Sequence, residues 1–332
     1  MIVALLLVLA PVSVHLLYLA WLSRAPRDRS RPTDGAARAR SIDVFVPTAN
    51  EERFIADKLE NLRQLTYPAE RLTLWVLDGD SDDRTLDEAA RIHDDRIRLV
   101  RTGVRGKSAQ MKAGLRRATA DLILVTDADA RLEPETLTRM VAALDASPDT
   151  AVVGTPISPG AAHPVERLHW RLLNWMWRHE ARYGSASLAA GPCYLARRAL
   201  IERLPADVTA DDVFVSFEAA ATGSRVGWAE TTVTELRTPR SVIAILEFRR
   251  RRMTAYLREV LRFLTRAPRM RPPARGIFLW RAALLLTLAL PLGAAALVAA
   301  VCTRAMRFPF GASAQPVRLR PQADRHEEEL VR

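Results

Sequence analysis

The fold is decided by the stretch Leu122-Ile123-Leu124-Val125-Thr126-Asp127-Ala128-Asp129. Its first four residues are all apolar, a run typical of a strand buried on both faces. Two carboxylates, Asp127 and Asp129, follow this strand directly. Because ligands bind at the carboxyl ends of strands in open α/β sheets, the stretch predicts both a buried strand and a binding site at its end.

Segments on both sides of this strand alternate between strand and helix patterns. Further strand patterns occur at residues 42–46, 72–77, 97–100 and 151–154, and helical patterns at 51–65, 108–118 and 134–144, with another helix after residue 83. This alternation predicts an α/β fold with a mainly parallel sheet. We expect the first strand to end at Pro47 and Pro134 to lie in the first turn of its helix.

Polar clusters follow three of the predicted strands, at residues 47–51, 78–83 and 127–129. Ordinary turn chemistry accounts for any single cluster of this kind. Because the carboxyl ends of parallel strands lie at one edge of a sheet, we expect all three clusters to form one site.

Two apolar runs flank this region, at residues 1–22 and 277–301. The first is long enough to cross a bilayer and has neither the basic start nor the cleavage site of a signal peptide, so it predicts an uncleaved anchor. The second contains Pro291 and predicts a kinked span or a re-entrant segment, with a buried core helix as the alternative.

Arginines determine the predicted orientation in the membrane. They follow the first apolar run and precede the second, which places the central region on the cytoplasmic side of a bacterial-type cell membrane. Arginines after the second run conflict with a simple crossing. We predict a basic linker at 23–41, a catalytic domain at 42–240, a basic interfacial helix region at 241–276 and a flexible tail at 302–332.

The formal net charge of +11 favours anionic partners. The basic residues cluster beside the apolar runs, which favours anionic lipid and predicts no nucleic-acid partner. Helical patterns at 163–183, which is rich in Trp, and at 243–264, which is basic, are typical of a membrane interface, with core packing as the alternative for the Trp residues. The two cysteines, Cys193 and Cys302, form neither a disulfide framework nor a zinc motif and fit a reducing compartment.

Two nucleotide-binding motifs are absent. Gly106-Lys107-Ser108 is not a P-loop because position 101 is Arg rather than Gly, and no Gly-x-Gly-x-x-Gly follows the first strand. Lys107 remains a candidate phosphate contact. Asp211 and Asp212 precede an apolar stretch, where they either stabilise a helix start or supply a general base.

These motifs together resemble the family 2 glycosyltransferases, which have the GT-A fold, including the cellulose and hyaluronan synthase-like members and members that glycosylate lipids. The resemblance covers about Ile42 to Arg252. It is carried by residues 47–52, 78–81, 106–114, 127–129 and 209–212, and by Gly191 before Pro192. Lys112 stands where the family usually has Asn.

The resemblance implies a role for each matching residue. Asp129 and Asp127 are expected to hold Mg²⁺ or Mn²⁺, and Asp212 to be the catalytic base. Donor contacts are expected from Pro47, Thr48, Asn50, Glu51, Asp78 or Asp80, Lys107 and Asp127. Gly191, Asp211, Arg249 and Arg252 are expected on the acceptor or phosphate side.

The predicted activity is inverting transfer of a sugar from a UDP- or GDP-sugar to a hydroxyl of a membrane lipid or lipid-linked acceptor. Processive members carry Gln-x-x-Arg-Trp on the interfacial helix. The matching residues here are Arg249, Arg252 and Met253, so only the Arg is retained. A processive polysaccharide synthase and a non-catalytic, membrane-tethered scaffold with a degenerate site are the alternatives.

Overall fold

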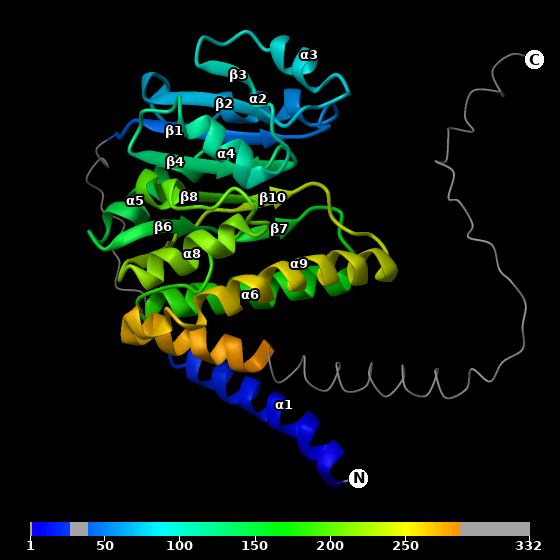
Figure 1. The fold of residues 1–332 in the computed structure, drawn as a ribbon, viewed down its shortest axis with the longest axis vertical. Helices are drawn as coiled ribbons and strands as arrows, with labels where there is room; N and C mark the ends of the chain where they lie inside the picture. Colours follow the sequence, from blue (N-terminus) through cyan, green and yellow to red (C-terminus); the bar gives the residue numbers. More distant parts are fainter. Residues whose placement is uncertain (1, 27–38, 286–332) are drawn as a thin grey trace, which may run out of the picture. The chain divides into compact units, whose positions relative to one another are not determined.

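A seven-stranded sheet forms the centre of the computed structural model, which describes residues 2–26 and 39–285. Its strand order is β3-β2-β1-β4-β8-β6-β9 (Figure 1). The strands are β1 (Ile42–Thr48), β2 (Leu72–Asp78), β3 (Ile97–Arg101), β4 (Leu122–Thr126), β6 (Thr150–Gly154), β8 (Cys193–Arg197) and β9 (Arg225–Trp228). The first four strands in this order are parallel, whereas β8 is antiparallel to both β4 and β6.

A smaller sheet lies next to the end of β4. It contains β5 (Ala130–Leu132), β10 (Val233–Glu235) and β7 (Ile157–Pro159), with β10 in the middle. Strand β5 begins one residue after Asp129 and pairs antiparallel with β10. The small sheet therefore places the segment after β10 beside the acidic pair.

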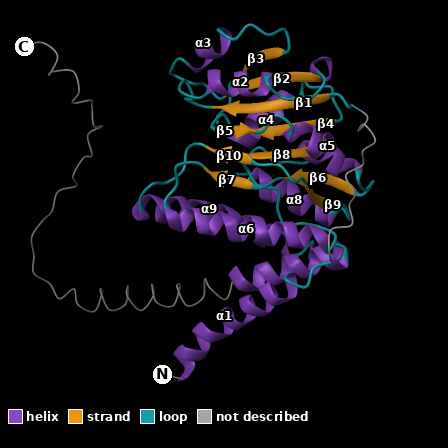
Figure 2. Ribbon diagram, turned by 180° about the vertical axis from the view of Figure 1, so that it is seen from behind, coloured by secondary structure: helices purple, strands orange, loops and turns teal. Residues whose placement is uncertain are grey.

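Helices cover the large sheet, with the strands forming the inner layer (Figure 2). They are α2 (Ile55–Arg63), α3 (Thr85–Ala90), α4 (Lys107–Leu115), α5 (Thr136–Asp145), α6 (Pro164–Arg182), α7 (Arg198–Glu202), α8 (Asp211–Ala221) and α9 (Val242–Leu264), with 3₁₀ turns at Ala69–Arg71 and Ala267–Arg269. The N-cap side chains His163 and Ser241 accept hydrogen bonds from the first turns of α6 and α9, which fixes where these two long helices begin.

The core lies between the sheet and these helices. All five residues of β4 are buried, as the apolar run predicted. Phe45 and Val125 are paired across β1 and β4, and neither side chain is exposed to solvent. Burying side chains of this size stabilises the fold by about 1.5–3 kcal/mol each.

Several predicted boundaries were wrong. Strand β1 continues through Pro47 to Thr48 alongside β2, and its pairing with β4 has already ended at Phe45, so the missing N–H of Pro47 interrupts no ladder there. Helix α2 begins at Ile55 rather than residue 51, since residues 52–54 form a turn and Phe54 is the N-cap. Pro134 precedes α5, whose first residue is Thr136. The α/β prediction is confirmed, although β8 makes the sheet mixed.

Helix α1 (Ile2–Leu22) packs against α6 through its last turns. Tyr18 and Leu22 form a small cluster with Met176, and Trp21 stacks on Tyr183 with ring centroids 4.1 Å apart. Among the residues that the structure describes, no helix meets the combined length and hydropathy that a bilayer crossing needs. The anchor at 1–22 stays a prediction. Most of the linker at 23–41, most of the segment at 277–301 and the tail at 302–332 lie outside the described residues.

Candidate active site

The acidic pair lies in a tight turn between β4 and β5. The Asp127 N–H donates to the Pro192 carbonyl over 3.1 Å, and the Ala130 N–H donates to the Asp127 carbonyl over 3.2 Å. Because Pro192 precedes β8, which pairs with β4, the mixed part of the sheet holds this turn in place.

Lys107 joins the acidic pair to the start of α8. Its Nζ lies 2.7 Å from Asp127 Oδ1 and 3.3 Å from Asp211 Oδ2, and it donates to the Gly191 carbonyl over 3.2 Å. Burial lowers the pKa of Lys107, but the charges of Asp127 and Asp211 outweigh burial and raise it overall. Lys107 is therefore a permanent cation that bridges the two acidic segments.

Asp211 and Asp212 are the first residues of α8 and have different surroundings. The Tyr194 hydroxyl donates to Asp211 Oδ2 over 2.7 Å, so Asp211 is held by both Tyr194 and Lys107. Neither carboxylate is the N-cap, because Ala210 holds that position. Burial and the neighbouring Asp211 charge raise the pKa of Asp212 to about 6. A carboxyl with such a pKa can accept a proton near neutral pH.

Gly191 lies against Asp212. A Cβ atom at position 191 would come within 3.0 Å of Asp212 Oδ2, so any side chain there would push the carboxylate aside. Glycine therefore permits the close approach of the turn before β8 to the start of α8.

The ends of β1 and β2 are linked through their turns. The Asn50 N–H donates to Ser81 Oγ over 2.9 Å, and Asn50 Oδ1 accepts from the Asp82 N–H over 3.0 Å. Asp78 is fully buried and accepts from the Ser81 hydroxyl over 2.5 Å, whereas Asp80 is exposed with φ of 60°. Asp78 thus builds the turn, and Asp80 is the one of the two that faces solvent.

Pro47 and Thr48 are the last residues of β1 and lead into this turn. The Thr48 carbonyl accepts from the Gly79 N–H over 2.9 Å and from Gln110 Nε2 over 2.9 Å. No local pattern singles out Gln110, because a glutamine within a helical pattern is usually exposed to solvent.

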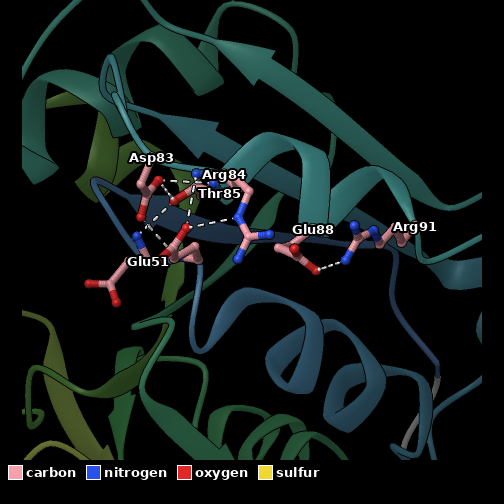
Figure 3. A network of polar contacts seen from close by, with 7 residues as sticks. Glu51, Asp83, Arg84, Thr85, Glu88 and Arg91 are labelled. Carbon is pink, nitrogen blue, oxygen red and sulfur yellow. Dashed lines mark hydrogen bonds and ion pairs between the residues drawn. The ribbon is translucent and has the colours of Figure 1, made fainter. Parts of the chain in front are cut away.

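The backbone N–H and the side chain of Glu51 contact different parts of the site. Its N–H donates to Thr85 Oγ1 over 2.7 Å within a polar network that includes Asp83, Arg84 and Glu88 (Figure 3). The Glu51 carboxylate points away from that network and pairs with Arg237. Arg237 Nε also lies 3.6 Å from Asp129 Oδ2, a contact that sequence reasoning missed.

Arg249 and Arg252 belong to α9 and pair with acidic residues of α6 and β10. Arg249 pairs with the buried Glu166 over 2.8 Å, and Arg252 pairs with Glu235 over 3.1 Å while lying 4.1 Å over the Phe248 ring. Burial raises the pKa of Glu235 to about 7. Burial and the Asp211 charge raise the pKa of Asp212, and the charges of Lys107 and Arg252 lower it by a smaller amount, so Arg252 acts electrostatically on this carboxyl. No contact links Arg249 to that carboxylate among the interactions that the structure describes.

The acidic pair fits a divalent cation in part. Burial and the Asp127 charge raise the pKa of Asp129, so a further positive charge beside this carboxylate would stabilise its ionised form. Mg²⁺ and Mn²⁺ take carboxylate oxygens and complete their octahedra with water or phosphate oxygens. The described residues contain no group of three or more acidic, His or Cys side chains placed to hold a metal ion. The pair therefore suits a cation that it shares with a ligand.

Comparison with known proteins agrees with this geometry. The family model described as Glycosyl transferase family 2 matches residues 43–204. Those residues are a family 2 glycosyltransferase domain. The match contains the acidic pair, Lys107 and Gly191, and ends before α8.

A mannosyltransferase from Pyrobaculum calidifontis, solved in complex with GDP-Man and Mn²⁺, is similar over nearly the whole chain. The TM-score is 0.72 at 27% identity, with 91% of this chain and 90% of that chain covered. The α/β fold of the family 2 domain is thus the GT-A fold.

Curated relatives match a shorter stretch. An N-acetylglucosaminyltransferase of Mesorhizobium japonicum is 27% identical over 49% of this chain and 41% of its own length. A beta-monoglucosyldiacylglycerol synthase of Synechocystis is 32% identical over 30% of this chain and 22% of its own length. The chain thus spans less than half the length of these two relatives.

Proposed function

We propose that this chain is a metal-dependent, inverting glycosyltransferase that moves a sugar from a nucleoside diphosphate sugar to a hydroxyl of a membrane lipid or lipid-linked acceptor. The observation that carries the proposal is the Lys107 bridge. Lys107 contacts Asp127 of the acidic pair and Asp211 beside Asp212, so one cation fixes the donor side against the candidate base.

The chemistry follows from these positions. The acceptor hydroxyl oxygen forms a bond to the anomeric carbon, the bond from that carbon to the diphosphate breaks, and Asp212 takes the hydroxyl proton. A single displacement of this kind inverts the anomeric centre. A divalent cation at Asp127 and Asp129 supplies, when bound, positive charge that offsets the charge on the departing diphosphate. Lys107 keeps the Asp127 and Asp211 carboxylates close together through its two ion pairs.

The acceptor proposal is supported by the face formed by α6 and α9, which lie side by side in both views (Figures 1 and 2). The exposed apolar side chains of these two helices include Val165, Leu168 and Leu172 of α6 and Val242, Ile243, Leu246 and Met253 of α9. Arginines 249–252 follow on α9. An exposed apolar surface with arginines suits an anionic membrane, where a lipid acceptor would be found. We place the catalytic domain on the cytoplasmic side because arginines follow the first apolar run and precede the second.

The proposal is tested with purified protein in detergent. Binding of UDP and GDP is measured by calorimetry with Mn²⁺, with Mg²⁺ and with chelator, and transfer of labelled sugar to a membrane lipid extract is then followed. We expect metal-dependent binding of one nucleotide and a labelled lipid bearing one sugar. Asp129→Asn should weaken the metal-dependent binding. Absence of binding under every condition would favour the scaffold alternative, and long products would favour a processive synthase.

A further inference from the structure

Besides Lys107, which pairs with Asp127, two further cations approach the acidic pair from different directions. Lys58 of α2 is buried, and its Nζ donates to Thr126 Oγ1 over 2.7 Å and to the Ala130 carbonyl over 2.6 Å, on either side of the pair. Arg237 reaches Asp129 from the segment between β10 and α9. Lys58 is fixed by hydrogen bonds within the fold, whereas Arg237 contacts the Asp129 carboxylate itself.

Arg237 cross-links the ends of two strands. It pairs with Glu51 beyond β1 and lies 3.6 Å from Asp129 beyond β4, and its guanidinium lies 5.0 Å above the Phe54 ring. These contacts give the Oδ2 atom of Asp129 a positive partner, and a cation bound by Asp129 would need a carboxylate oxygen. A metal ion and a guanidinium cannot occupy the same oxygen of one carboxylate at full strength.

The Arg237 contact is replaceable, unlike that of Lys58. The Arg237 side chain is 55% exposed, and exposed ion pairs contribute little to stability. The backbone is anchored just before it, because the Leu236 N–H donates to the Asp129 carbonyl over 2.8 Å. Arg237 can therefore leave Asp129 without breaking the small sheet.

We propose that Arg237 occupies the cation-binding side of Asp129 in the metal-free enzyme and is displaced when a divalent cation binds. This inference rests on the proposed metal-dependent function. Displacement also removes the positive partner of the Glu51 carboxylate, whereas the backbone of this segment stays in place, because the His163 N–H donates to the Pro239 carbonyl over 3.4 Å.

The test uses Mn²⁺ alone, without nucleotide, on the full chain. Binding is followed from the loss of the paramagnetic resonance signal of free Mn²⁺. Arg237→Ala should bind Mn²⁺ about three- to ten-fold more tightly than the unmodified protein, since the competing ion pair is gone. Arg240→Ala is the matched control: it removes the same charge from an exposed position three residues away and should shift the affinity by less than about two-fold.

A second variant, Arg237→Gln, keeps most of the side-chain length and should tighten Mn²⁺ binding to a similar extent. Unchanged or weaker binding in both Arg237 variants, with binding by the unmodified protein intact, would overturn this inference alone. Equal tightening in Arg240→Ala would also overturn it, because general electrostatics would then suffice. If the unmodified protein binds no Mn²⁺ with or without UDP or GDP, the metal-dependent function fails as well.

Discussion

Adjacent carboxylates at the start of α8 illustrate how position decides chemistry at the scale of single residues. Asp211 accepts a hydrogen bond from Tyr194 and pairs with Lys107, so its charge is already balanced by contacts within the fold. Asp212 faces Gly191 and has a pKa raised to about 6 by burial and by Asp211. Substitution by the isosteric Asn should therefore affect turnover at Asp212 and stability at Asp211.

Asp212→Asn should lower turnover by about 100-fold or more, because the amide cannot take the acceptor proton. Nucleotide binding should be nearly unchanged, and the melting temperature should not fall. Asp211→Asn should instead lower the melting temperature, since it weakens the buried contacts with Lys107 and Tyr194. Turnover at saturating acceptor, calorimetry and thermal melting measure these effects. Near-normal turnover in Asp212→Asn would remove this residue from the mechanism.

The raised pKa of Asp212 makes a separate prediction on pH. The folded protein disfavours the ionised form, so this carboxyl makes the fold less stable as pH rises from its ordinary pKa of 3.8 through about 6. Asp212→Asn should therefore melt at a higher temperature than the unmodified protein at pH 8, with the difference shrinking towards pH 4. The base form is lost as pH falls through about 6, so turnover should fall there as well. A melting difference that is the same at both pH values would contradict the assignment.

Helix α2 positions the acidic turn at the scale of secondary structure. Lys58 holds the residues on either side of the pair, and one turn later Asn61 exchanges two hydrogen bonds with the backbone of Leu132, at 2.9 and 2.8 Å. Burial lowers the pKa of Lys58 to about 8, so the fold pays a penalty for keeping this charge next to Asp127 and Asp129.

Lys58→Met should loosen the turn between β4 and β5 while the sheet remains intact. The Thr126 hydroxyl and Ala130 carbonyl lose a partner, so hydrogen exchange at the amides of Asp127 and Ala130 should accelerate by about ten-fold. Asn61→Leu is the matched control, because it removes two hydrogen bonds from the same helix but only at Leu132. Equal acceleration at Asp127 in both variants would show that α2 acts by general packing instead.

What the sequence predicts depends on the length and regularity of each element. The apolar run at 122–125 and the amphipathic patterns of α6 and α9 were found because periodicity needs several residues to show. Strands β5, β7 and β10 have three residues each, too few for a pattern, and are not predicted. Strands β8 and β9, of five and four residues, are not predicted either, although β8 is as long as β4. Motif spacing placed Asp127 and Asp212, but Lys58, Tyr194 and Arg237 act through contacts between distant segments, which no local pattern records.

At the scale of the whole chain, three segments meet on the buried Glu180 of α6. Its carboxylate accepts from the Tyr18 hydroxyl of α1, from Arg281 over 2.8 Å and from the Ser187 N–H over 2.8 Å. Arg281 lies in the helix that begins at residue 272 and continues to the end of the described residues. The two segments predicted to associate with the membrane are thus fastened to the GT-A domain at one buried charge.

Glu180→Gln should destabilise this junction. It leaves Arg281, whose side chain is 13% exposed, without its ionic partner, and breaking a buried pair on one side costs about 3–5 kcal/mol. We expect a lower melting temperature and faster proteolytic cleavage between α1 and the domain. Nucleotide affinity should change little, because no active-site residue contacts Glu180 among the interactions that the structure describes. Tyr18→Phe is the milder comparison, since it removes one hydrogen bond, worth about 1 kcal/mol.

The double variant Glu180→Leu with Arg281→Met decides what the charge contributes. Replacing both partners of a buried pair by apolar residues is often neutral or stabilising, because both desolvation penalties disappear. The double variant should therefore recover most of the melting temperature that Glu180→Gln loses. If Glu180 merely fills space, Glu180→Gln will melt like the unmodified protein. If instead the double variant melts as low as Glu180→Gln, the hydrogen bonds from Tyr18 and Ser187, rather than the ion pair, hold the two helices to the domain.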